Sequence, residues 1–73
     1  MPFIDVKIIE GVLDDAQKQQ LIAELANAVV RVGGEAMRPM TRCAITEVRS
    51  GLWGVAGKPL TTEQARPPTA PAN

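Results

Sequence analysis

The chain has 73 residues, a length that allows one domain at most. Its eight basic and eight acidic side chains cancel, so it lacks the broad basic field that binds nucleic acids or anionic membranes. It has no His and a single Cys, Cys43, which we assign as a small core residue. One Cys forms no internal disulfide and is too few for a zinc site. Composition therefore argues against nucleic-acid binding, membrane binding and metal chemistry.

The small size of the chain favours self-association. Hydrophobic residues make up 45% of it, which is ordinary for a globular domain. A chain this short buries a modest fraction of its surface and is marginally stable alone. Without a disulfide, oligomerisation is the expected source of stability. The N-terminus lacks the basic region and long apolar run of a secretory signal, so we predict a cytoplasmic protein.

A strand followed by a helix is expected in the first half. Residues 2–9 alternate with period two and are rich in β-branched side chains, which predicts a strand that ends at Glu10-Gly11. A helix is expected from about Asp15 to Val32, capped by Asp14 or Asp15 and stopped by Gly33-Gly34. One stripe of this helix is apolar, at Leu21, Ile22, Leu25, Ala26, Val29 and Val30.

The second half predicts a second strand and a short glycine-rich element. Residues 35–40 are expected to form a connection, and residues 41–48 a strand. A strand, one crossover helix and a second strand form a βαβ unit, whose strands run parallel. Residues 52–57 are expected to form a hairpin or an edge strand against a neighbour. We predict an α/β (α+β) fold: one βαβ unit with a short C-terminal hairpin over residues 1–60, then a mobile Pro-rich tail over residues 61–73.

One helix covers one face of a two-stranded sheet and leaves the other face bare. The apolar segment around Trp53 also has nothing else in the chain to cover it. We therefore expect a homo-oligomer, a hexamer or at least a dimer, in which sheets from different copies join.

Pro2 follows the initiator Met and has a chemical option that other positions lack. Methionine aminopeptidases generally remove Met before a small residue, and the mature chain then begins with a free secondary amine. Burial in an apolar pocket disfavours the charged form of such an amine. An amine that is neutral near the working pH serves as a general base or a nucleophile. Taken alone, Pro2 is also consistent with a merely stiff chain terminus.

A set of short motifs in a fixed order resembles the 4-oxalocrotonate tautomerase family. The set comprises Pro2, Glu10-Gly11, Gln17-Lys18-x-x-Leu21-Ile22, Ile45-Thr46-Glu47-Val48 and Gly51-x-Trp53-Gly54-x-x-Gly57. The resemblance implies a βαβ subunit that dimerises into a four-stranded sheet, usually within a hexamer built as a trimer of dimers. It also implies a cofactor-free isomerase in which the N-terminal proline moves a proton between oxygen and carbon of an enol or dienol acid. No cofactor and no metal are expected.

The resemblance assigns roles to individual residues. Arg42 matches the arginine that binds a substrate carboxylate and polarises the carbonyl, and Trp53 matches the aromatic residue that walls off the pocket. The family's second arginine, which grips the far carboxylate of a dicarboxylate, is replaced by Val12 and Leu13. The loop after the helix is longer than in the best-known members, and Arg38 within it is a candidate for the missing charge.

Simpler interpretations of these residues remain open. Arg42 and Arg38 are also consistent with solvated charges, and Trp53 with an interface anchor that has no part in catalysis. Water addition or decarboxylation on the same scaffold is the alternative activity. A non-catalytic subunit of a hetero-oligomer is the non-enzymatic alternative, and the replacement at Val12-Leu13 favours it.

Overall fold

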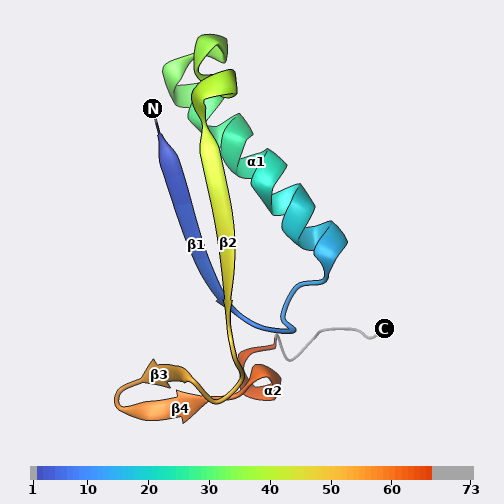
Figure 1. Cartoon of the computed structure of the whole chain (residues 1–73), viewed down its shortest axis with the longest axis vertical. Helices are drawn as coiled ribbons and strands as arrows, with labels where there is room; N and C mark the ends of the chain where they lie inside the picture. The colour runs from blue at the N-terminus through green and yellow to red at the C-terminus, as the bar shows by residue number, and fades with distance from the viewer. Residues whose placement is uncertain (1, 67–73) are drawn as a thin grey trace.

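A computed structural model describes residues 2–66. Two parallel strands, β1 (Phe3–Ile9) and β2 (Arg42–Val48), are connected by the helix α1 (Asp15–Gly33) and the 3-10 helix η1 (Glu35–Met40). A hairpin of β3 (Trp53–Val55) and β4 (Lys58–Leu60) follows, and then a helical turn, α2 (Thr62–Ala65). Figure 1 shows α1 lying along the strand pair, with the hairpin and α2 at the end of the strands farthest from the N-terminus. The predicted βαβ unit with a C-terminal hairpin is confirmed.

The alternation of β1 divides the sheet into a covered face and an open face. Ile4, Val6 and Ile8 are half-buried, whereas the residues between them are exposed. The register pairs Ile4 with Cys43 and Val6 with Ile45, so the shielded side chains of both strands share one face. The predicted strand pattern is therefore confirmed, and among the described residues the opposite face is open at Phe3, which is 64% exposed.

The helix α1 begins at a complete capping box. The Asp14 carboxylate accepts a hydrogen bond from the Gln17 amide at 2.8 Å, and the Gln17 side chain accepts one from the Asp14 amide at 2.9 Å. An ion pair of 2.9 Å between Lys18 on α1 and Glu47 on β2 joins the helix to the sheet. The observed bounds differ from the expected ones by one residue at the C-terminal end.

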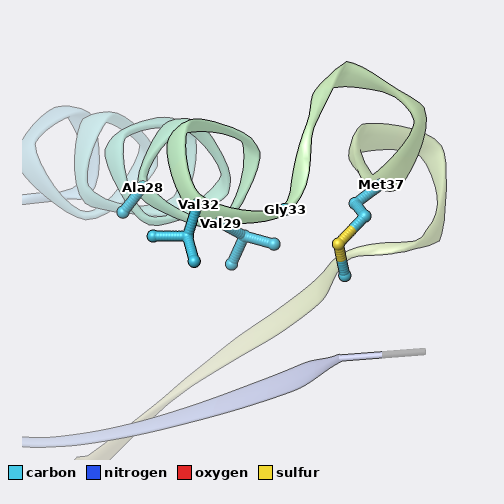
Figure 2. A pocket seen from close by; sticks show the side chains of 5 residues that line it. All are labelled: Ala28, Val29, Val32, Gly33 and Met37. Carbon is cyan, nitrogen blue, oxygen red and sulfur yellow. The ribbon is translucent and has the colours of Figure 1, made fainter.

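The connection between α1 and β2 has more structure than the sequence predicted. Residues 35–40 form η1, in which Thr41 Oγ1 donates to the Met37 carbonyl at 2.8 Å. A Cβ at Gly33 would overlap the sulfur of Met37, so a larger residue there would require the flexible Met37 side chain to move. Figure 2 shows Met37 folded back toward the end of α1, beside Val29 and Val32. Together with Ala28, these residues line a shallow apolar pocket of about 330 Å³.

The hairpin closes through a tight turn with two residues of positive φ. Ala56 has φ of 54° and Gly57 has φ of 77°, which is the backbone pattern of the type I′ hairpin. Val55 pairs with Lys58 across this turn, and Trp53 pairs with Leu60 at the open end. The hairpin is thus formed within the chain.

The first residues of the predicted tail form a helical turn. Thr61 caps α2 with a second capping box, and the Thr62 hydroxyl donates to the Glu10 carbonyl at 2.7 Å. Thr62 and Ile9 are the buried residues of the described part of the chain. Composition indicated a tail because Pro dominates the following stretch, but the polar bonds of Thr62 hold this turn in place. Residues 67–73 of the predicted tail lie outside the described residues.

None of the described helices is long and apolar enough to cross a membrane.

Candidate functional site

Pro2 and Arg42 lie side by side at one end of the sheet. The Pro2 carbonyl accepts a hydrogen bond of 3.0 Å from the Arg42 amide, which extends the parallel ladder by one step beyond the Phe3–Arg42 pair. Pro2 is half-buried, whereas Arg42 is exposed. Arg42 forms no ion pair among residues 2–66. A candidate amine and a candidate anion-binding group therefore share one strand end.

Arg38 lies near this end of the sheet, but its guanidinium is engaged. Its Nε donates to Glu35 Oε2 at 2.6 Å, and one terminal nitrogen donates to Asn27 Oδ1 at 2.9 Å. The Glu35 bond, and after it the Glu35 charge, raise the pKa of Arg38, and Arg38 in return lowers the pKa of the Glu35 carboxyl. The structure thus ties Arg38 to η1 and α1, which favours a structural role over substrate binding.

Trp53 lies at the opposite end of β1 from Pro2. A seven-residue strand is roughly 20 Å long at about 3.3 Å per residue, and Figure 1 shows the hairpin at the far end from the N-terminus. One chain therefore brings Pro2 and Arg42 together but does not bring Trp53 to them.

Trp53 forms part of a second apolar pocket, of about 320 Å³, at the end of β1. The lining side chains come from β1, the turn after it, the hairpin and α2, and they are Lys7, Ile8, Ile9, Val12, Trp53, Leu60 and Ala65. We call this the far-end pocket. Sequence reasoning singled out Trp53 and noted Val12, but it missed Leu60 and Ala65. Leu60 lies on β4 and Ala65 on α2, and the local signal for α2 is the Thr61–Gln64 capping pair.

A hydrogen-bond network fixes α2 beside the far-end pocket. The Glu10 carboxylate accepts from the Ser50 amide at 3.0 Å, and the Ser50 hydroxyl accepts from the Thr62 amide at 2.9 Å. Gly11, with φ of 80°, allows this close approach, since a Cβ there would lie 3.1 Å from the Thr62 methyl carbon. Glu10 thus serves as an acceptor within the fold, as a strand-end residue.

Sites for a metal ion need several ligands close together. Within residues 2–66 no group of three or more Asp, Glu or Cys side chains meets that condition. Cys43 is half-buried on β2 as a free thiol.

Comparison with known proteins establishes the family. The pattern of the family described as "Tautomerase enzyme" matches residues 2–63. Two probable tautomerases, from Staphylococcus saprophyticus and Staphylococcus haemolyticus, are 37% and 40% identical over 57 residues. These alignments cover 78% of this chain and 90% and 89% of the relatives.

A solved structure shows the same fold. YwhB, a homologue of 4-oxalocrotonate tautomerase, superimposes with a TM-score of 0.71 and 33% identity, over 80% of this chain and 92% of that one. The chain belongs to the tautomerase family, and the resemblance noted in its motifs is confirmed. Membership supports a tautomerase-like function of the isomerase class.

Proposed function

We propose that this chain is a cofactor-free keto–enol tautomerase that uses the nitrogen of Pro2, after removal of Met1, as its general base. The observation that carries the proposal is the pairing of Pro2 with Arg42, whose guanidinium has no partner within the described chain. Proton transfer at a carbon near a carbonyl needs a base and a cation where negative charge develops. Pro2, which would supply the base, and Arg42, which would supply the cation, lie at the adjacent ends of β1 and β2.

The reaction moves one proton within the substrate and rearranges its bonding electron pairs. The Pro2 nitrogen takes the proton of the enol hydroxyl, and the oxygen lone pair forms the C=O bond. The C=C pair, relayed along the diene where there is one, forms a new C–H bond with the proton returned by the prolinium. Arg42 binds the substrate carboxylate beside the reacting oxygen. Its positive charge stabilises the negative charge that develops on that oxygen. No net oxidation occurs and no group leaves.

The remaining wall of the site comes from a neighbouring copy. Both strands of the β1–β2 pair have a free edge within residues 2–66, and free edges favour pairing. A two-fold axis that joins two such sheets edge to edge makes the joined strands antiparallel. If β1 meets β1 of the second copy, Pro2 of one copy faces the far-end pocket of the other, including its Trp53. We propose a homo-oligomer of this kind, a dimer or a hexamer built from dimers, in the cytoplasm.

The decisive experiment compares two forms of the protein that differ at the N-terminus. One form is processed, so that Pro2 carries a free amine, and the other retains one residue before it, so that the nitrogen is an amide without basicity. We expect the second form to lose roughly 10²- to 10⁴-fold in turnover of enol carboxylic acids, the range for a general base. Mass spectrometry identifies each terminus, and sedimentation matches the oligomeric state. Equal activity of the two forms would overturn the proposal.

The pH dependence gives an independent check on the same assignment. The kcat/KM of the processed form should rise with pH along a limb that reports deprotonation of the free amine. Hydration of an unsaturated acid by a charged amine, the alternative activity, would instead give a limb that falls as the amine loses its proton.

A further inference from the structure

The far-end pocket has a chemical character that constrains the substrate. Apart from Lys7, its lining is hydrocarbon or indole: two Ile side chains, Val12, Trp53, Leu60 and Ala65. Its volume of about 320 Å³ exceeds the ~150 Å³ cavity that suffices to hold benzene. A phenyl or branched alkyl group of a small acid therefore fits inside it.

Each of the two cations near this pocket has one hydrogen-bond partner within the chain. The Lys7 ammonium donates to the Asp5 carboxylate at 2.8 Å. The guanidinium of Arg66, which follows the lining residue Ala65, donates to the Gly11 carbonyl at 3.2 Å. Val12, the residue directly after Gly11, places an isopropyl group in the wall. A carboxylate entering the pocket would lose water and meet no unengaged cation among the lining residues, which is costly.

The wall is fixed rather than adaptable. The bonds from Thr62 to Ser50 and to the Glu10 carbonyl hold α2 against the turn that carries Val12. Leu60 is held by its ladder pairing with Trp53. An apolar pocket with backbone-anchored walls selects a ligand group by shape and hydrophobicity.

We infer that the substrate is an enol monocarboxylic acid with an apolar aryl or branched alkyl substituent, which occupies the far-end pocket of the copy facing Pro2. This inference rests on the proposed function and adds a substrate class to it. Arg42 binds the one carboxylate, the pocket takes the apolar group, and Val12 sets the preference against a second carboxylate. The proton transfer itself is the one described above.

The test uses three substrates with one reaction in common. They are 2-hydroxy-3-phenylacrylate, the unsubstituted monocarboxylate 2-hydroxypenta-2,4-dienoate, and the dicarboxylate 2-hydroxyhexa-2,4-dienedioate. For the processed wild type, we expect kcat/KM to be highest for the aryl acid. The kcat/KM for the dicarboxylate should be about tenfold lower or more, because its second carboxylate gains no charge-assisted hydrogen bond in the pocket.

Two variants of Val12 separate charge from size. Val12→Arg places a guanidinium in the wall and should raise kcat/KM for the dicarboxylate by about 10- to 100-fold relative to the aryl acid. Val12→Gln is the matched control, since it is longer than Val but neutral, and it should not produce that reversal. Arg66→Ala should leave the ranking of the three substrates unchanged. Circular dichroism and sedimentation show whether each variant folds and assembles as the wild type does.

Three outcomes would overturn the inference while the proposed function stands. A wild-type preference for the dicarboxylate that disappears in Arg66→Ala would mean that Arg66 binds a second carboxylate. Equal kcat/KM for the aryl acid and the unsubstituted monocarboxylate would mean that a neighbouring copy fills the pocket. An unchanged ranking in a correctly folded Val12→Arg variant would mean that Val12 does not face the substrate. Failure of the proposed function gives a different result. In that case, blocking the Pro2 nitrogen leaves the turnover of every substrate unchanged.

Discussion

The two ends of β1 differ in their chemistry. At the first end, Pro2 and Arg42 bring polar groups to the end of the sheet, where the Arg42 amide donates a 3.0 Å hydrogen bond to the Pro2 carbonyl. At the other end, Trp53 and its neighbours form a pocket whose lining is apolar apart from Lys7. Neither end is a complete site for acid–base chemistry, since one lacks a wall that excludes water and the other lacks a base.

Under the proposed function, this difference is the reason for a second copy of the chain. A strand of seven residues keeps its ends roughly 20 Å apart, farther than a small enol acid reaches. In the proposed homo-oligomer, an antiparallel neighbour places unlike ends next to each other. The exposed Phe3 and the uncovered sheet face are consistent with such an interface.

The largest expected effect comes from removing the cation at the first end. Arg42→Ala should reduce kcat/KM for enol acids by about 2–4 kcal/mol of transition-state stabilisation. The Arg42 amide, rather than its side chain, bonds Pro2, so the strand pairing should survive. Steady-state kinetics with circular dichroism checks this. Arg42→Lys retains the charge without the planar guanidinium. Its kcat/KM should lie between the values for the wild type and Arg42→Ala. Unchanged kinetics for Arg42→Ala would show that the side chain is merely solvated.

Mixing two defective variants tests whether the two ends belong to different copies. One variant has a blocked Pro2 nitrogen, and the other is Trp53→Ala, which we expect to lose at least about tenfold in activity. Random pairing of equal amounts makes half of the pairs mixed, and one of the two sites in each mixed pair is intact. About a quarter of the wild-type activity should therefore return. Activity no higher than the average of the separate variants would place each site within one chain.

A much smaller effect is expected for Arg38, whose guanidinium is bound to Glu35 and Asn27. Arg38→Ala should change kcat/KM by less than about threefold, as expected for an exposed side chain away from the reacting groups. Asn27→Ala is the matched control, because it removes one of the same contacts without removing a charge. A large loss of activity in Arg38→Ala alone would restore Arg38 as a substrate-binding residue.

The smallest effect concerns the contact that holds α1 on the sheet. Hydrogen bonds to Glu47 and then Asp15 raise the pKa of Lys18 above its ordinary value. The stabilisation from this shift is fully present below the unfolded-state pKa, about 10.5, and is lost as pH rises through the higher folded-state pKa. Thermal melts of the wild type and Lys18→Met should therefore differ at pH 8 and converge toward pH 11. If the difference in melting temperature between the two proteins does not change with pH, the stabilisation comes from packing of the aliphatic part of the Lys18 side chain.

The sequence determined the local elements of this protein. Alternation in residues 2–9, the Asp14 cap and the Gly33-Gly34 stop were sufficient to place β1 and α1 within one or two residues. These signals are local, because strand period, capping and glycine termination depend on neighbours a few positions away. The motif order was also sufficient for the family, and it indicated Pro2 and Arg42 as candidate site residues.

The tertiary structure decided how those residues are grouped. It separated Trp53 from Pro2, turned Arg38 toward Glu35 and Asn27, and folded α2 back onto Glu10 through Thr62. The far-end pocket exists because segments about 50 residues apart, such as Val12 and Ala65, meet there. No local pattern encodes such meetings, since they depend on where the whole chain places each surface. The chemistry proposed at Pro2 therefore follows from the residue itself, whereas the apolar selectivity proposed for its partner surface depends on the fold.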